Sequence, residues 1–263
     1  MPRVLIRTIE QATAVPMPAG FAGTSTASDY FGNLTAAETP LQLHAFDLAP
    51  AHSLSFLDSA IDRIAYLWKG AVEVKGHRLQ QGSSFVVEHG AEVQATATAG
   101  PAVLLVFAAG TTDRQHRAGG HTHLLPTQSV PRSDLGGPMK VAGGMHADST
   151  CPTCEVWLHE NSFPGASDEQ RAHPDAGVHS HTEDEIIVVT AGQIRLGARL
   201  FDPGTALAIA ARTLYSFIPG PDGLSFINFR ASAPGMIAFP DRPPMDERAY
   251  WSARLPRPDC ITL

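Results

Sequence analysis

The chain has 263 residues, of which 43% are hydrophobic and 17% are charged. This composition can bury a substantial core, which excludes an intrinsically disordered chain, and the length suits two domains because domains cluster near about 100 to 150 residues. Lys and Arg number 19 against 26 Asp and Glu, so the formal net charge is −7. A negative chain repels phosphate backbones and anionic lipid headgroups, and we expect neither nucleic acid nor membrane partners.

The sequence also bears on the compartment. No apolar run approaches the about 18 residues of a membrane span. Arg3, Arg7 and Glu10 interrupt the N-terminus where a signal peptide needs an apolar stretch. Three cysteines are too few for a disulfide framework in a chain of this size. Together these features predict a cytoplasmic protein.

Short runs rich in Val, Ile, Leu and Phe recur between Gly, Pro and Asp residues, whereas helical periodicity is hard to find. Such a pattern is typical of an all-β fold. The predicted strands fall into two groups and are, in chain order, 41–48, 63–68, 71–75, 84–88, 91–96, 102–108, 155–160, 185–190, 193–196, 206–210, 213–218 and 224–230.

The two groups form a repeat. Gly70 and Gly82 stand twelve residues apart in the first group, as do Gly192 and Gly204 in the second. The second pair follows the first by 122 residues, and the same offset superposes the last strand of each group. Two copies of one β unit therefore account for most of the chain.

This repeat predicts the domain organisation. We expect an N-terminal domain over 1–115, a connector rich in Gly, Pro and Ser over 116–150, and a C-terminal domain over 151–263. The segment before the first group and the Pro-rich tail from Pro234 have no counterpart in the repeat. We expect these segments to pack as arms across the domains or across the seam of a homodimer.

The run GVHSHTEDEIIVVTAG places His179, His181 and Glu185 ahead of Gly192. Side chains two apart on a strand share a face, so the two imidazoles point the same way, and Glu185 lies four residues on with the same parity. Two neutral imidazoles and a carboxylate form a common open site for a divalent transition metal such as Fe, Mn, Ni or Zn. We predict one such ion per chain at this site. The alternative is that both histidines lie in a flexible acidic loop of an empty binding shell.

This stretch resembles the first motif of the cupin superfamily, which is H-x-H, three or four residues, Glu, six residues and Gly. The chain matches each of these spacings, although the motif's leading glycine is displaced to Gly177, two residues before His179. The resemblance covers roughly residues 41–230 and implies a small double-stranded β-helix barrel. Together with the repeat, it implies two such barrels in tandem, a bicupin.

The first unit lacks the motif. Counting back from Gly70 places Leu57, Ser59 and Arg63 at the positions of the three predicted ligands. No such trio binds a cation. We therefore expect the N-terminal domain to be metal-free and structural.

The second cupin motif normally supplies one more histidine shortly after a Pro-x-Gly turn. No histidine follows His181 in this chain, and the aligned segment DPGTALAIAARTLYSF carries Tyr215 in about that place. Either the Tyr215 oxygen ligates or hydrogen-bonds towards the metal, or water fills the position and Tyr215 binds substrate. An ordinary strand tyrosine is the remaining alternative. The missing histidine argues against extradiol and sulfur dioxygenase activities, which depend on three histidines.

Polar residues on the last strand of the second unit are candidate substrate contacts. Asn228 and Arg230 replace Val106 and Ala108 of the first unit. This exchange is costly in a closed core unless something polar occupies the cavity, and Arg230 suits a carboxylate. Arg195 is a further candidate of the same kind. With reversed strand parity, these side chains would face outward.

His159 is a third histidine near the predicted site. His44 matches it in the first unit at an offset of 115 residues. Because the first unit lacks the motif, we expect a structural role that both units share.

Two further motifs are weaker. Cys151 and Cys154 form a C-x-x-C that would suit a redox pair or, with His146, half of a zinc site, but no second C-x-x-C and no βαβ unit accompanies it. We expect a turn with two free thiols. His121 and His123 follow Gly-Gly without a carboxylate four residues on, and we expect a loop pair.

The sequence thus predicts a metal-dependent enzyme that acts on a small, anionic organic molecule in the C-terminal domain. Glu185 would stay bound as a ligand or loosen to act as a base. A lyase, isomerase or hydrolase and an iron dioxygenase are all open, with the missing histidine favouring the non-redox reactions. The rival hypothesis is a non-catalytic protein that binds a small molecule.

Overall fold

The computed structural model describes residues 4–32, 41–109, 117–136, 141–173 and 177–263. Strands dominate this part of the chain, so the predicted all-β class is confirmed. The chain divides into two compact units that interleave in sequence. The C-terminal unit comprises Met1–Glu10, Pro131–Asp148 and Trp157–Arg257, and the N-terminal unit comprises Gln11–Val130, Ser149–Val156 and Pro258–Leu263. None of the described helices has the length and apolarity to cross a membrane.

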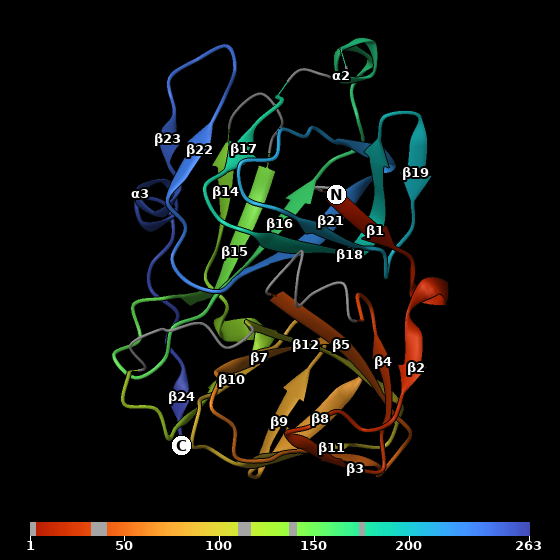
Figure 1. The fold of residues 1–263 in the computed structure, drawn as a ribbon, viewed down its shortest axis with the longest axis vertical. Helices are drawn as coiled ribbons and strands as arrows, with labels where there is room; N and C mark the ends of the chain where they lie inside the picture. The colour runs from red at the N-terminus through yellow and green to blue at the C-terminus, as the bar shows by residue number, and fades with distance from the viewer. Residues whose placement is uncertain (1–3, 33–40, 110–116, 137–140, 174–176) are drawn as a thin grey trace. The chain divides into compact units, whose positions relative to one another are not determined.

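The N-terminal unit consists of two sheets. Their strands are β2 (Thr13–Val15), β3 (Phe21–Gly23), β4 (Thr26–Asp29), β5 (Leu41–Leu48), β6 (Ser53–Phe56), β7 (Arg63–Lys69), β8 (Ala71–Val74), β9 (His77–Gln80), β10 (Ser84–Val87), β11 (Val93–Ala97), β12 (Ala102–Ala109), β13 (Thr122–Leu125) and β24 (Ile261–Thr262). One sheet has the order β2-β4-β5-β12-β7-β10-β13-β24 and the other β3-β6-β11-β8-β9 (Figure 1).

Alternating side chains of both sheets form the core of this unit. Phe46 and Leu48 of β5 and Val72 and Val74 of β8 belong to one buried cluster. Residues two apart on a strand face the same side, so this alternation explains why these sequences fold as half-buried strands.

The C-terminal unit has one large and one small sheet. The large sheet contains β1 (Val4–Arg7), β14 (Arg132–Gly136), β15 (Val141–Asp148), β16 (Trp157–Phe163), β18 (Glu185–Leu196), β19 (Arg199–Phe201), β20 (Ala206–Ile209) and β21 (Ile218–Arg230). Its order is β1-β20-β18-β21-β16-β15-β14, with β19 paired to β18. The small sheet joins β17 (Ser180–His181), β22 (Met236–Ala238) and β23 (Met245–Asp246). The helices are α2 (Asp168–Ala172) and α3 (Glu247–Ser252), and the 3-10 turns of the two units are η1 (Ile9–Gln11) and η2 (Thr127–Ser129).

Strand register repeats between the two units at the predicted offset. Ala65 lies opposite Val106 in the N-terminal unit, and Ile187 lies opposite Asn228 in the C-terminal unit. Each residue of the second pair follows its counterpart by 122 positions. The residue equivalences drawn from the glycine spacing therefore agree with the hydrogen-bonded register.

The repeated glycines have a shared physical cause. Gly70 and Gly192 have φ angles of +79° and +63°, and a Cβ would lie 2.1 Å from the Pro101 carbonyl oxygen or 2.2 Å from that of Gly223. Pro101 and Gly223 are themselves equivalent positions of the repeat. Only glycine adopts this conformation and permits this approach without strain.

The observed units differ from the predicted boundaries. Strand β1 pairs with β20 of the C-terminal unit, and β24 pairs with β13 of the N-terminal unit (Figure 1). The segment predicted as a connector, 116–150, contributes β13, β14 and β15. The terminal segments expected to be arms instead add strands to the sheets, because their backbone groups find partners at sheet edges.

Three of the predicted strands also differ. The separate strands at 185–190 and 193–196 are one strand, β18, which continues through register shifts against β21. The strand predicted at 213–218 is largely absent, and Tyr215 forms only an isolated bridge with His179. β-Bulges allow β18 to continue through its register shifts, and a period-two pattern in the sequence does not reveal them.

Candidate active site

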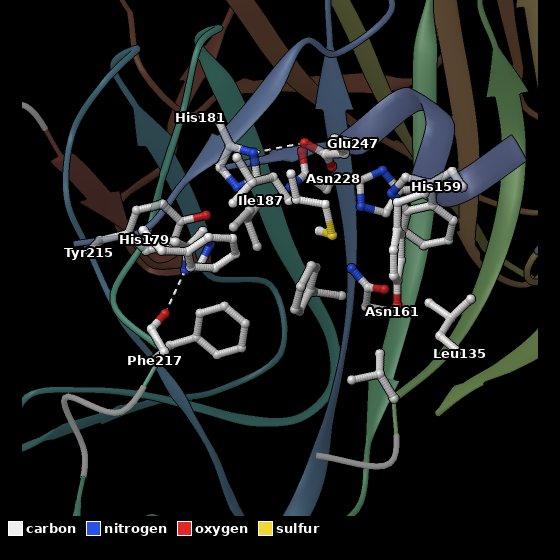
Figure 2. A pocket seen from close by; sticks show the side chains of 18 of the residues that line it. Leu135, His159, Asn161, His179, His181, Ile187, Tyr215, Phe217, Asn228 and Glu247 are labelled. Atoms are coloured by element: carbon white, nitrogen blue, oxygen red, sulfur yellow. Dashed lines mark hydrogen bonds and ion pairs between the residues drawn. The ribbon is translucent and has the colours of Figure 1, made fainter. Parts of the chain in front are cut away.

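A cavity of about 310 Å³ lies in the C-terminal unit (Figure 2). Its apolar wall includes Leu135, Phe163, Ile187, Phe217, Phe226 and Trp251, and its polar side chains are His159, Asn161, His179, His181, Tyr215, Asn228, Arg230, Arg242 and Glu247. A mostly apolar cavity with a few convergent polar groups is typical of a small-molecule site.

His179 and His181 share a direction because one residue separates them at β17. Their ring centroids are 5.0 Å apart. Nδ1 of His179 lies 2.8 Å from the carbonyl oxygen of Gly177, and Nδ1 of His181 lies 2.8 Å from Oε2 of Glu247. With each Nδ1–H donated to an acceptor, each Nε2 keeps a lone pair, which is the usual tautomer of a metal-binding histidine.

Glu185 begins β18 and is 1% exposed. Its Oε1 accepts a hydrogen bond from the Tyr215 hydroxyl at 2.7 Å, and its Oε2 accepts from Asn228 Nδ2 at 2.7 Å and Arg230 Nη2 at 2.9 Å. Burial raises the pKa of this carboxyl, but His181, Arg230 and the two neutral donors outweigh burial and hold the pKa at about 2. Glu185 is therefore a carboxylate, with Oε1 3.9 Å from His181 Nε2.

Arg230 joins two buried carboxylates. Besides Glu185, it contacts Oε1 of Glu247 through Nη1 at 2.7 Å. Its Nη2 is also 2.9 Å from His181 Nδ1, which Oε2 of Glu247 approaches to 2.8 Å. The carboxylate only accepts, so we assign the Nδ1 proton to the hydrogen bond with Glu247, and the guanidinium donates elsewhere. Burial lowers the pKa of Arg230, whereas Glu247 and Glu185 raise it above the usual value. Two carboxylates and one guanidinium leave one uncompensated negative charge.

Tyr215 acts as a donor towards Glu185. Burial and the adjacent Glu185 carboxylate raise the pKa of its hydroxyl well above the usual value. Its ring lies 4.6 Å from that of His179. The hydroxyl thus remains a neutral phenol that orients the carboxylate.

No protein-family model matches the chain, and no curated protein matches it. Solved structures do. A protein described as glyoxylate-induced, from Pseudomonas aeruginosa, has a TM-score of 0.67 at 11% identity, over 88% of each chain. Oxalate decarboxylase from Bacillus subtilis has a TM-score of 0.61 at 12% identity, over 92% of this chain and 79% of that one. A protein described as a dioxygenase, from Nostoc punctiforme, has a TM-score of 0.60 at 12% identity, over 88% of this chain and 84% of that one.

The chain has the cupin fold. At these identities the likeness concerns the fold alone, and the side chains of this chain carry any further argument. The cupin fold brings His179, His181, Glu185 and Tyr215 together at the start of β18.

The predicted substrate contacts are not all brought to this site. Asn228 and Arg230 line the cavity, so their parity is inward, as expected. Arg195 is not among the lining residues, and its Nε donates to the carbonyl oxygen of Gly197 at the β18–β19 turn. The long twisted strand β18 carries Arg195 away from the cavity, which residue parity does not show.

His159 also lines the cavity, opposite His179 in Figure 2. Its Nδ1 accepts a hydrogen bond from Trp157 Nε1 at 2.8 Å. Burial lowers the pKa of His159 to about 3, so the ring is neutral. These contacts agree with the structural role inferred from its match to His44.

The sequence did not predict a site role for Arg242 and Glu247, two polar residues of the tail that line the cavity. The tail has no counterpart in the repeat, so no alignment pointed to them. Arg242 is exposed, with Cζ 3.8 Å from the centre of the Phe239 ring. Glu247 is the first residue of α3, where Asp246 caps the helix through the Ala249 amide. The capping residue Asp246 is visible in the sequence and indicates a helix start. It does not indicate which residues Glu247 contacts.

The N-terminal unit differs at the equivalent positions. Arg63 replaces Glu185 and is 2% exposed, with its guanidinium donating to the carbonyl oxygens of Gly20 and Leu57. Burial lowers the pKa of Arg63 to about 10. A buried guanidinium in place of Glu185 disfavours a cation at this position.

A different part of the N-terminal unit, which was expected to be metal-free, brings potential metal ligands together. These are Glu88, His123, Cys151 and Cys154, whose donor atoms all lie within 4.8 Å of one another. Among the described residues, no other set of three or more His, Cys, Asp or Glu side chains has donor atoms this close together. The trio His179, His181 and Glu185 does not meet this distance either. His123 is a strand residue of β13, not part of a loop pair. His146 lies on β15 and contacts Glu160, 3.4 Å away.

Proposed function

We propose that the C-terminal unit is a metal-dependent cupin enzyme acting on a small, anionic organic molecule, and that the two units are cupin barrels in tandem. One observation carries the proposal. Both Nε2 atoms of His179 and His181 are left free by Nδ1 hydrogen bonds beside the ionised Glu185, at a cavity of about 310 Å³.

These side chains fit a divalent transition metal such as Fe, Mn, Ni or Zn. Two imidazoles and a carboxylate suit such ions and leave coordination positions open. The uncompensated negative charge of Glu185, Glu247 and Arg230 also favours a cation. A bound ion would polarise a carbonyl or hydroxyl group or activate water or dioxygen.

The surrounding residues have separate tasks. Tyr215 and Asn228 hold the Glu185 carboxylate in one orientation, and the Tyr215 hydroxyl is 2.7 Å from Oε1, within reach for a proton. Phe217 and Phe226 form part of the apolar wall of the cavity. Arg242 offers an exposed cation to an anionic substrate, whereas Arg230 is already paired with two carboxylates.

The reaction class stays within the range that the sequence left open: lyase, isomerase, hydrolase or dioxygenase. The fold neighbours include a decarboxylase with Mn(II) centres and a protein described as a dioxygenase. Proteins named for different reactions therefore share this fold, and fold alone does not choose between them.

One observation favours a second candidate, a non-catalytic protein that captures a metabolite. Arg230 already supplies a cation to Glu185, at 2.9 Å. A site neutralised in this way holds its carboxylates without a metal, and its cavity would then serve binding only.

Metal analysis of protein purified anaerobically and without an affinity tag tests the proposal. We expect Fe, Mn, Ni or Zn in the C-terminal unit of the unmodified chain, and loss of that ion in the double variant His179→Ala/His181→Ala. The matched control, His52→Ala/His77→Ala, should keep it. The double variant should remain soluble and β-rich because the cores, not the ligands, hold the fold.

A second measurement separates enzyme from binder. Azide added to cobalt-loaded protein should change its visible spectrum if the C-terminal ion has an open position, and the change should vanish in the histidine double variant. Equal metal content in the unmodified and double-variant chains would refute the metal site. An ion without an azide response would favour a closed, non-catalytic site.

A further inference from the structure

Four potential metal ligands converge in the N-terminal unit, away from the positions equivalent to the cupin motif. Glu88 follows β10 and is fully buried, and Cys154 is 3% exposed. His123 and Cys151 are partly buried. All four donor atoms lie within 4.8 Å of one another.

Strand pairing brings these residues together. His123 of β13 lies opposite Val86 of β10, so the imidazole reaches the carboxylate of Glu88, just after β10. Oε1 of Glu88 is 2.6 Å from His123 Nε2. The segment that carries both cysteines is held to the same unit by the Glu155 amide, which donates to Asp62 Oδ2 at 2.9 Å.

Two of the distances match the edges of a tetrahedron around zinc. With zinc bonds of about 2.3 Å to sulfur and about 2.0 to 2.2 Å to nitrogen or oxygen, a sulfur lies roughly 3.6 Å from its nitrogen and oxygen neighbours. Cys151 Sγ is 3.6 Å from His123 Nε2 and 3.7 Å from Glu88 Oε1. The shorter separation of His123 Nε2 and Glu88 Oε1 is that of a hydrogen bond, whose proton an ion would replace.

Outer contacts hold the ligands in place. Nδ1 of His123 is 2.9 Å from Thr262 Oγ1, so Nε2 is the nitrogen directed at the group. The second carboxylate oxygen of Glu88 accepts from the His121 amide at 2.9 Å, and Thr153 Oγ1 donates to Oε1 at 2.5 Å. A structural metal site has ligands oriented in this way.

Arg117 supplies the compensating charge. Its Nη1 donates to the carbonyl oxygens of Cys151 and Cys154. Two thiolates and one carboxylate around a dication leave one negative charge, which a neighbouring guanidinium offsets.

We propose that Glu88, His123, Cys151 and Cys154 bind a structural zinc ion with four protein ligands. Paired thiolates with imidazole select zinc over magnesium or calcium, and four protein ligands leave no open position. The ion ties the 149–156 segment to strands β10 and β13. The chain then carries two metal sites of different kinds, and this one does not depend on the proposed function of the C-terminal unit.

Zinc analysis of the full chain, purified without a tag, tests the site. In His179→Ala/His181→Ala, which empties the C-terminal site, we expect roughly one zinc equivalent, and adding Cys151→Ser/Cys154→Ser to that variant should remove it. Cys260→Ser, which changes the cysteine outside the group, is the matched control and should retain the ion. Because the double serine change then removes only the remaining ligands, the melting temperature of the combined variant should no longer respond to added zinc or chelator.

Cobalt replacement in the unmodified chain keeps the proposal testable if that variant does not fold. Tetrahedral cobalt bound by two thiolates should give strong visible bands and a sulfur-to-metal charge-transfer band, which the histidine double variant should also show. Absence of the charge-transfer band in the unmodified chain would overturn the proposal. So would a Cys151–Cys154 disulfide in the freshly isolated protein, detected as a mass two hydrogens lower.

Discussion

Nδ1 of His181 lies 2.8 Å from Oε2 of Glu247, although 66 positions separate the two residues. This contact ties the first turn of α3 to the predicted metal-binding motif. A carboxylate behind an imidazole fixes the tautomer and increases the basicity of the other ring nitrogen. The tail is therefore part of the site.

Glu247→Gln should weaken metal binding at the C-terminal site by about 10- to 100-fold, because the His181 ring loses its charged partner. Competition with a chelator measures this affinity. Glu169→Gln removes one charge from the exposed face of α2 and should have no effect. If the Glu247 variant binds metal as tightly as the unmodified chain, Glu247 does not support the ligand.

Tyr215→Phe should leave metal affinity within about threefold, since three ligands remain, while turnover falls because Glu185 loses a hydrogen-bond donor. The change keeps the ring and removes only the oxygen. Calorimetric titration with Mn(II) measures the affinity. A loss of tenfold or more would show that the phenolate is a ligand, and no change in affinity, substrate binding or turnover would make Tyr215 an ordinary barrel residue.

Arg230→Met should destabilise the C-terminal unit by about 3 to 5 kcal/mol, because the buried carboxylates Glu185 and Glu247 lose their shared cation. Urea unfolding measures the change. Arg248→Met, at an exposed position of α3, should change the free energy of unfolding by no more than about 0.5 kcal/mol. Equal stability of the two variants would mean that the carboxylates are neutralised in another way.

Glu160 should contribute to acid sensitivity. Burial raises the pKa of its carboxyl, but His146 and Arg132 outweigh burial and bring the pKa to about 2, from 4.5. A folded-state pKa below the unfolded one stabilises the protein above about pH 4.5, and this stabilisation is lost as the pH falls towards 2.

Glu160→Gln should therefore cost on the order of 2 kcal/mol at pH 7, a value that allows for screening at the partly exposed Arg132, and almost nothing near pH 2. Urea unfolding across this pH range measures the difference. Glu73→Gln, at an exposed strand position, is the control: its free energy of unfolding should differ from that of the unmodified chain by the same amount at every pH. A loss of stability in Glu160→Gln that did not change with pH would contradict the role of this ion pair.

The all-β class, the repeat and the ligand motif could be predicted because each rests on short-range rules. Period-two alternation marks the strands, and steric demand at Gly70 and Gly192 marks their turns. His179 and His181 share a direction because they are two apart in an extended segment. These rules act over a few residues and are therefore visible in the sequence.

Tertiary structure decided which remote groups meet. Glu247 reaches His181, and Cys151 lies 3.7 Å from Glu88 although 63 positions separate them. No local period encodes such pairs, because they depend on which strand edges find partners once the cores pack. The same packing placed Arg195 outside the cavity and turned the Tyr215 hydroxyl towards Glu185. The motif could thus be found from the sequence, whereas its supporting residues and the second group of ligands required the folded sheets.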